Sequence, residues 1–385
     1  MSFIEILDSS LRDGAQSEGI NYSLLDKIKI IQALDLLGVS YIEAGNPESG
    51  PKDRKLYDEI RTLPLSFSKV AAFGSTRRKN VSAADDEGLR ALAAAGTDVV
   101  VIFGKSWRSQ VEKVLQTTPE ENLKMISGSV RFLKDSGKRV FFDAEHFFDG
   151  YFEDPQYAEK TLEAAFEEGA ERLVLCDTRG GTYPHEVARL TKLLTERFGR
   201  VIGVHLHNDT GCAVAGSLAA AEAGAVQIQG TLLGCGERCG NADLCSVIAN
   251  LQVKMGVSCI PEENMKRLTR TARFIAEVSN TPLAASTPFV GKSAFAHKAG
   301  MHAHAVLADP QTYEHIDPQA VGNERRILIS EHTGRAAVLE RIKDIAPGLS
   351  KSSPELLALT EEIKRLELEN YTFEAADASF ELLVR

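Results

Sequence analysis

The feature of this sequence that most limits its possible folds is a regular alternation of short apolar runs with longer amphipathic segments. Eight runs are predicted to be β-strands: 5–8, 41–45, 69–74, 98–103, 139–144, 172–177, 202–207 and 227–232. Runs such as 99–103 (VVVIF) are apolar at consecutive positions, which indicates parallel strands covered on both faces. The segments between them are predicted to be helices: 24–37, 86–95, 119–136, 156–169, 184–198 and 214–224.

Eight β/α units within about 250 residues predict a closed (β/α)8 TIM barrel. The alternative is an open, doubly wound sheet, which usually carries a glycine-rich dinucleotide-binding turn after its first strand. Residues 11–14 (LRDG) do not have that motif. Polar residues instead gather at the ends of the strands: Arg12, Asp13, Glu43, Glu145, Asp177, Thr178, His205 and His207. Barrel enzymes place their chemistry at the carboxyl ends of the strands, so this distribution favours the barrel.

Three regions are predicted from the point where the alternation stops. A catalytic barrel over 1–275 is followed by accessory subdomain I over 276–345 and by accessory helical subdomain II over 346–385. The formal net charge of −10 argues against partners such as nucleic acid or an anionic membrane surface. No apolar stretch reaches the roughly 18 residues that a membrane span needs. The first residues show no secretory signal, so a cytoplasmic location is expected.

His205 and His207 lie two residues apart at the end of the seventh predicted strand, so both imidazoles are expected on one face. A carboxylate can come from Asp13, because a closed barrel brings the first strand close to the seventh and eighth. Two imidazoles and one carboxylate would form a divalent metal site with open positions, compatible with Zn²⁺, Mn²⁺ or Mg²⁺. Asn208 and Asp209 follow directly and are expected to orient the imidazoles.

The open positions of such a metal suit a 2-oxo acid, which chelates through its carboxylate and its keto oxygen. Arg12 would help to polarise the keto oxygen and to stabilise the developing alkoxide. The simpler alternative is a surface pair of Arg12 and Asp13 in a turn. A glycine-rich loop, residues 234–241 (GCGERCGN), would let Glu237 and Asn241 point into the barrel mouth, unless its glycines only make a turn.

A third histidine-containing segment, residues 297–304 (HKAGMHAH), lies outside the predicted barrel. Solvated or helix-capping histidines are the simpler interpretation of this segment.

Together these segments resemble a known family. Residues 8–16 (DSSLRDGAQ) are similar to the first-strand signature of the metal-dependent acyl-transferring barrels, which include 2-isopropylmalate, homocitrate and citramalate synthases. Residues 205–209 (HLHND) and 234–242 are similar to the second signature of that family. The stretches that look most like its citramalate synthase branch are 142–151, 293–298, 313–318 and 321–326.

The resemblance implies a Claisen-type condensation of acetyl-CoA with pyruvate, followed by hydrolysis to citramalate and free CoA. The metal site it implies consists of Asp13, His205, His207 and Asn241, the last in or next to the coordination shell. The implied substrate-binding residues are Arg12, Gln16, Asp143 and Thr178. The implied catalytic residues are Arg12, Glu145, Glu237, His302 and Tyr313. The general base stays open between Glu145, Glu237 and His302.

In the family, the residues that match His302 and Tyr313 enter the active site of the partner subunit, so the resemblance also implies a homodimer. Isoleucine synthesis is the usual pathway of the branch. The chain ends at Arg385, about where the regulatory domain of the family would begin, so a C-terminal regulatory domain is expected to be absent. Residues 45–51 (GNPESGP) stand where many citramalate synthases are expected to have a tryptophan, which bears on the choice of 2-oxo acid.

Three other functions are alternatives to a citramalate-forming synthase. A sibling synthase would use another 2-oxo acid and make 2-isopropylmalate, homocitrate or, as a Re-type enzyme, citrate. An aldol-type acyl-CoA lyase would lack an accessory region like 276–385. A non-catalytic metal-binding barrel would have no need for Arg12 beside Asp13.

Overall fold

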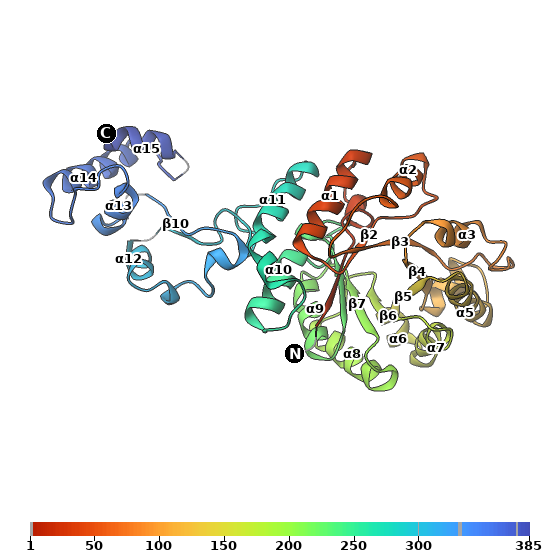
Figure 1. Ribbon diagram of the computed structural model, residues 1–385. Helices are drawn as coiled ribbons and strands as arrows, with labels where there is room; N and C mark the ends of the chain where they lie inside the picture. Colours follow the sequence, from red (N-terminus) through yellow and green to blue (C-terminus); the bar gives the residue numbers. More distant parts are fainter. Residues whose placement is uncertain (1–2, 299, 330–332, 375) are drawn as a thin grey trace. The chain divides into compact units, whose positions relative to one another are not determined.

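The structure, a computed structural model, describes residues 3–298, 300–329, 333–374 and 376–385 (Figure 1). Eight parallel strands follow one another around a closed barrel, in which β1 pairs with both β2 and β8. The strands are β1 Glu5–Asp8, β2 Tyr41–Glu43, β3 Lys69–Ser75, β4 Val99–Lys105, β5 Arg139–Glu145, β6 Arg172–Asp177, β7 Ile202–Leu206 and β8 Gln227–Gly230. The predicted (β/α)8 fold is therefore confirmed.

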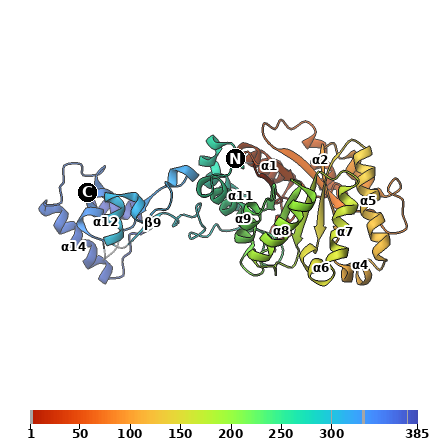
Figure 2. The same cartoon turned by 90° about the horizontal axis from the view of Figure 1, so that it is seen from below.

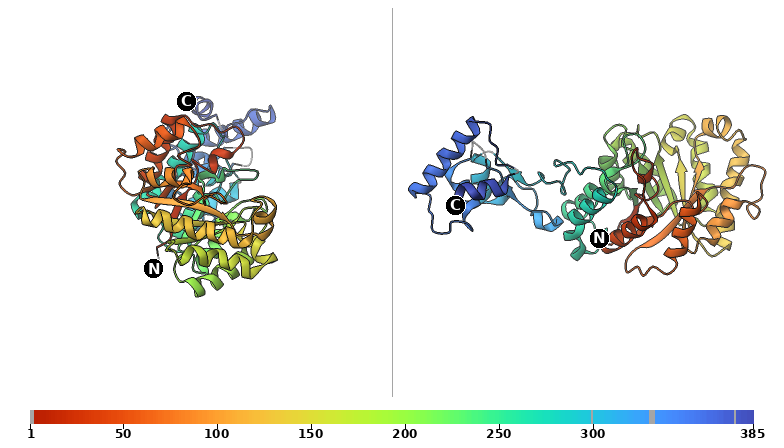
Figure 3. Two further views of the ribbon diagram at one scale, coloured as in Figure 1. Left: turned by 90° about the vertical axis from the view of Figure 1, so that its right-hand side faces the viewer. Right: turned by 90° about the horizontal axis from the view of Figure 1, so that it is seen from above.

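Helices cover the outside of the strands (Figure 3). They are α1 Leu24–Leu37, α2 Pro51–Ile60, α3 Glu87–Ala94, α4 Arg108–Lys113, α5 Pro119–Asp135, α6 Phe147–Glu153, α7 Pro155–Phe166, α8 Pro184–Phe198, α9 Ala213–Glu222, α10 Leu244–Ala249 and α11 Leu268–Val278. α1 begins at a capping box of Ser23 and Asp26 and ends at Gly38, whose φ of 92° favours glycine. The turn at Gly38 leads the chain from α1 to β2.

The interior of the barrel is apolar over part of its length. Its core cluster consists of Leu7, Tyr41, Ala71, Val99, Val101 and Phe141. Side chains two residues apart on a strand share a face, so Asp143 and Glu145 point to the same side as Phe141. The inward face of β5 therefore changes from apolar to acidic toward its carboxyl end, where the chemistry of such barrels is found.

The chain forms two compact units, Met1–Leu283 and Ala284–Arg385. In the second unit, β9 (Ala296–His297) pairs in parallel with β10 (Arg326–Ile327). Its helices, shown from a second side in Figure 2, are α12 Gly300–Ala308, α13 Arg335–Ile342, α14 Pro354–Leu368 and α15 Asp377–Val384. α13, α14 and α15 share one core of Ile329, Val338, Ile342, Leu356, Ile363, Phe373 and Phe380. Accessory helices after the barrel are thus confirmed.

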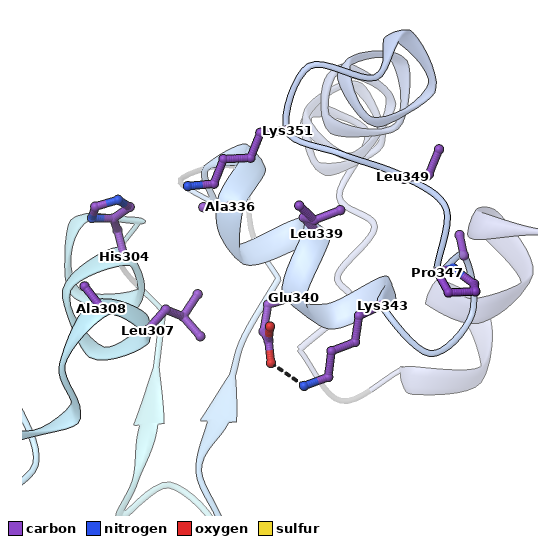
Figure 4. A pocket seen from close by; sticks show the side chains of 11 residues that line it. His304, Leu307, Ala308, Ala336, Leu339, Glu340, Lys343, Pro347, Leu349 and Lys351 are labelled. Carbon is purple, nitrogen blue, oxygen red and sulfur yellow. Dashed lines mark hydrogen bonds and ion pairs between the residues drawn. The ribbon is translucent and has the colours of Figure 1, made fainter.

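The second unit contains a cavity of about 490 Å³ between α12 and α13. His304 and Leu307 come from α12, Leu339 comes from α13, and Lys343 follows directly after α13 (Figure 4). Lys343 donates a hydrogen bond of 2.6 Å to Glu340 of α13. The lining is mainly apolar, and its charged residues are this ion pair and Lys351. Across the described ranges of the whole chain, no helix has the length and apolar character that crossing a membrane requires.

Candidate active site

Asp13, His205 and His207 meet at the carboxyl ends of the barrel strands. Oδ2 of Asp13 lies 3.2 Å from Nε2 of His205 and 3.8 Å from Nε2 of His207. The two imidazole centroids are 5.3 Å apart, and all three residues are buried. Within the described part of the chain, this is the one group of three or more His, Cys, Asp or Glu residues whose ligand atoms converge closely enough to hold a metal ion.

Unsatisfied polar atoms next to this group fit a cation. Oδ1 of Asp13 and both polar atoms of the Asn241 side chain are buried without a hydrogen-bond partner. Buried polar atoms are usually paired, and oxygen and imidazole donors suit Zn²⁺, Mn²⁺ and Mg²⁺. An isolated β-bridge holds Asn241 beside His207. The donor set therefore fits a divalent cation.

The glycine-rich loop after β8 makes this placement of Asn241 possible. Gly240 has a φ of 84°, and a Cβ atom at this position would collide with the carbonyl oxygen of Gly234. The backbone N–H of Asn241 donates to that same carbonyl at 3.0 Å. The glycines thus do more than turn the chain, because they let the loop fold back tightly enough to bring Asn241 to His207.

The protonation states of Asp13 and His207 also suit metal binding, whereas burial, which would lower the pKa of His205, is outweighed by the hydrogen bond and the charge of Asp13, which raise it. Burial alone would raise the pKa of Asp13, but the Arg12 charge and the hydrogen bond with His205 hold it well below its usual range. Burial and the neighbouring His205 lower the pKa of His207 to about 4. At neutral pH, Asp13 is therefore ionised and His207 is neutral, as metal ligands must be.

Arg12 connects this group to the end of β2. Its Nε lies 2.6 Å from Oε2 of Glu43, and one terminal nitrogen lies 3.0 Å from Oδ2 of Asp13. The guanidinium also lies 4.0 Å from the centroid of the Phe73 ring. Ser9 donates a 2.6 Å hydrogen bond to the same oxygen of Glu43. Two carboxylates and an aromatic face thus hold the cationic group in one orientation.

A cavity of about 210 Å³ opens over these residues. Its lining is Arg12, Asp13, Gln16, Phe73, Phe103, Asp143, Glu145, Cys176, Thr178, His205, His207, Glu237 and Arg238. Every barrel residue predicted for the site, apart from Asn241, therefore lines one cavity. The structure also shows Lys105, which the sequence analysis missed. Its Nζ lies 2.5 Å from Oε2 of Glu145, at neighbouring strand ends.

Three further predicted residues, Thr178, Asp143 and Glu237, line the same cavity in different surroundings. Oγ1 of Thr178 accepts a hydrogen bond of 2.8 Å from the backbone N–H of His146. Burial and the charge of Glu43 raise the pKa of Asp143 to about 7. The side chain of Glu237 is 61% exposed, so this carboxylate lies at the solvent-facing side of the cavity.

The expectation that Asn208 and Asp209 orient the imidazoles is wrong. Oδ1 of Asn208 accepts from the backbone N–H of Ala213 at the start of α9. Asp209 pairs with Arg238 at 2.8 Å. Gln229 contacts Nδ1 of His205 instead, at 3.0 Å.

His302 and Tyr313 lie in the second unit. Their ring centroids are 4.3 Å apart, and Tyr313 is half-exposed. The rings of His302 and Tyr313 are therefore in contact within the second unit. Their roles remain predictions, and Ala299 in the same histidine-containing segment lies outside the described residues.

The fold and this site define a class: a (β/α)8 barrel enzyme with a candidate metal centre at its carboxyl rim. The HMGL-like family model matches residues 3–275, and the model for a homocitrate synthase post-HMGL domain matches residues 289–370. The chain is 50% identical to the (R)-citramalate synthase of Aquifex aeolicus, over 99% of this chain and 72% of that protein. It is 47% identical to the (R)-citramalate synthase of Synechocystis sp., over 99% of this chain and 71% of that protein. This chain belongs to the citramalate synthase family, within the HMGL-like barrels.

Among solved structures, the HMG-CoA lyase of Bacillus subtilis superposes with a TM-score of 0.62 at 23% identity, over 74% of this chain and 96% of that one. At this identity the likeness shows a shared fold alone.

Proposed function

We propose that this protein condenses acetyl-CoA with pyruvate and hydrolyses the thioester, which yields citramalate and free CoA. The observation that carries the proposal is the group of Asp13, His205 and His207 with Arg12 beside it, in a chain 50% identical to a citramalate synthase over nearly its full length. This arrangement suits an acceptor with a carboxylate next to a keto group.

A bound divalent cation would supply Lewis acidity toward the keto oxygen. We propose Asp13, His205 and His207 as its ligands, with Asn241 in or next to the coordination shell. Zn²⁺, Mn²⁺ and Mg²⁺ all match these donors. Arg12 would stabilise the negative charge that develops on the keto oxygen during carbon–carbon bond formation.

Thr178 and Asp143 are suited to binding the acceptor. The Thr178 oxygen already accepts a hydrogen bond from His146, so its hydroxyl hydrogen is available for the carboxylate of a 2-oxo acid. Asp143, with its raised pKa, would present a neutral carboxyl group in part of the molecules at pH 7 and could donate as well. Gln16, which also lines the cavity, is proposed as a third binding residue.

Glu145 is the stronger candidate of the two barrel carboxylates for removing a proton from the acetyl methyl group. It lines the cavity beside the candidate metal ligands, and its ion pair with Lys105 holds the carboxylate in place there. Glu237 is largely exposed, and water around it would weaken its action as a base. His302, assisted by Tyr313, stays the alternative if the second unit of a partner subunit covers the site.

The shape of the cavity favours a small acceptor. Phe73 and Phe103 stack with centroids 5.4 Å apart, and Arg12 lies against the Phe73 ring. With these rings in its wall, a cavity of about 210 Å³ suits a small acceptor such as pyruvate. A second cavity of about 390 Å³ shares Arg12, Gln16, Phe73 and Phe103 with the first and offers space for the acetyl end of acetyl-CoA beside the acceptor.

Free-thiol release from acetyl-CoA with a panel of 2-oxo acids tests the proposed reaction. We expect pyruvate to be preferred over 2-oxoisovalerate, 2-oxoglutarate and oxaloacetate by at least about tenfold in kcat/KM, since pocket size discriminates by that order. A chelator should abolish release, and 3-hydroxy-3-methylglutaryl-CoA should not be cleaved. Equal rates with 2-oxoisovalerate would contradict the acceptor, and no release with any acceptor would contradict the synthase.

We further propose a homodimer in which His302 and Tyr313 complete the site of the partner subunit. A His205→Ala chain mixed and refolded with a His302→Ala chain would then regain about one quarter of wild-type sites, because half of the dimers are mixed and each has one intact site. Activity no higher than the sum of the two variants alone would argue against shared sites. A cytoplasmic location and a role in isoleucine synthesis stay predictions of the same family resemblance.

A further inference from the structure

Two buried glutamines, Gln227 and Gln229, occupy the barrel interior next to the candidate metal centre. They lie two residues apart on β8 and therefore share a face. In the strand register, Gln227 is opposite Glu5 of β1, and Gln229 is opposite His205 of β7. Both glutamines have no exposed surface. Burying an amide is costly unless it is hydrogen-bonded, so the partners of these side chains carry information about the site.

The hydrogen bonds form a continuous chain from one end of the barrel interior toward the other. Oε1 of Gln229 lies 3.0 Å from Nδ1 of His205. Nε2 of Gln229 donates to Oδ1 of Asp143 at 3.0 Å and to Oε1 of Gln227 at 3.3 Å. Nε2 of Gln227 in turn donates to Oε2 of Glu5 at 3.2 Å.

Glu5 is held firmly at the start of this chain. Arg172 at the beginning of β6 donates to both of its carboxylate oxygens at 2.8 Å, and the hydroxyl of Tyr41 donates to it at 3.2 Å. A carboxylate paired with an arginine in this way only accepts hydrogen bonds. In the hydrogen bond between Gln227 and Glu5, Gln227 must therefore be the donor.

This donor role fixes which end of each glutamine amide faces which neighbour. Gln227 must turn its nitrogen to Glu5, so its oxygen faces Gln229. The two hydrogens on the Gln229 nitrogen are then taken by Gln227 and Asp143, so the Gln229 oxygen faces His205. An oxygen in this place requires a hydrogen on Nδ1 of His205, so Nε2, the atom that faces Asp13, is the nitrogen left to bind a metal once its own hydrogen is lost.

We propose that Gln229 is a positioning residue that selects the metal-binding tautomer of His205, and that Glu5 sets the orientation of Gln229 through Gln227. This inference rests on the proposed metal-dependent function. Metal-bound histidines commonly donate their second N–H to an acceptor that fixes the ring and the tautomer. Here the acceptor is an amide, whose two ends are interchangeable, so a group beyond it has to decide which end faces the ring.

The Gln229→Met variant tests the central link, because methionine fills a similar volume and cannot accept the imidazole hydrogen in the same way. We expect about 10- to 100-fold weaker binding of Mn²⁺ or Zn²⁺, measured without substrate by competition with a chromogenic chelator. We also expect long-range ¹H–¹⁵N spectra of histidine-labelled, metal-free protein to show loss of the Nδ1–H form of His205. Unchanged affinity, or an unchanged tautomer, would overturn the proposal.

Thr191→Val is the matched control, because Thr191 is fully buried on α8 and its hydroxyl has no partner. This variant removes a buried polar atom outside the barrel interior and should bind metal like the wild type. Far-UV circular dichroism and the Tm of the metal-free proteins show whether each variant folds.

Glu5→Gln tests the far end of the chain. A glutamine here would give its oxygen to Arg172 and turn its nitrogen toward Gln227, which favours the reversed orientation of both amides. We expect weaker metal binding in the same direction as for Gln229→Met but smaller, because Asp143 still accepts from Gln229. If Glu5→Gln does not fold, Gln227→Met breaks the same connection. Wild-type affinity and tautomer in the variant that folds would overturn the role of Glu5.

These measurements contain neither acetyl-CoA nor a 2-oxo acid, so they separate the two proposals. A wild-type protein that binds no divalent metal would contradict the proposed function. If the wild type binds metal and the Gln229→Met variant binds it equally well, only the inference about the glutamines is contradicted.

Discussion

His205→Ala is expected to lower the rate of CoA release by about a thousandfold or more. Lewis-acid stabilisation by a bound metal contributes several kcal/mol to the transition state, and each 1.36 kcal/mol is about tenfold in rate. His205 supplies one of three converging ligand atoms. The Nδ1 atom of its ring forms a hydrogen bond with Gln229. The loss of His205 leaves Asp13 and His207 with only the weaker amide of Asn241 nearby, which is too little to hold a cation in a defined geometry. Thiol release and metal content of the purified variant are the measurements.

The matched control for His205→Ala is His185→Ala. His185 lies on α8 with its side chain 74% exposed, and it contacts Glu186 at 3.8 Å. The control should keep wild-type activity and metal content. Full activity of a folded His205→Ala protein would show that the cation, or the reaction, is held elsewhere.

Much of the barrel could be predicted because its determinants are local. Consecutive apolar residues indicate buried parallel strands, and α1 and α8 were predicted with their observed bounds. α2 was missed because it buries only Leu56, Tyr57 and Ile60 and is otherwise polar. α6 was missed because it follows β5 after one residue, His146, which has a left-handed φ of 59°. Its aromatic residues give no helical periodicity.

The metal group could be predicted for a different reason. His205 and His207 are close in sequence, and the closed barrel dictates that β1 lies next to β8, which brings Asp13 within reach. The partners of these residues could not be predicted, because they depend on the register between strands. Gln229 contacts Asp143 across 86 positions of sequence, and Lys105 reaches Glu145 from the neighbouring strand. No local pattern marks a glutamine on a strand as the partner of a metal ligand.

The prediction with the next largest effect concerns Arg12. Arg12→Lys is expected to lower kcat by about 10²- to 10³-fold, the usual loss when one group that stabilises an oxyanion is removed. Lysine keeps the charge, but a single ammonium cannot contact Glu43 and Asp13 in the fork geometry of a guanidinium. Arg78→Lys is the control, because Arg78 pairs with Asp86 and its side chain is 62% exposed.

Metal affinity decides what a loss of activity at Arg12 means. If Arg12 acts on the developing alkoxide, Arg12→Lys should bind Mn²⁺ within a few-fold of the wild type while turnover falls, and the conservative change should also keep the buried Glu43 partly neutralised. A drop in metal affinity as large as that of His205→Ala would mean that Arg12 serves mainly to hold Asp13. The two variants together therefore distinguish stabilisation of charge on the substrate from support of a ligand.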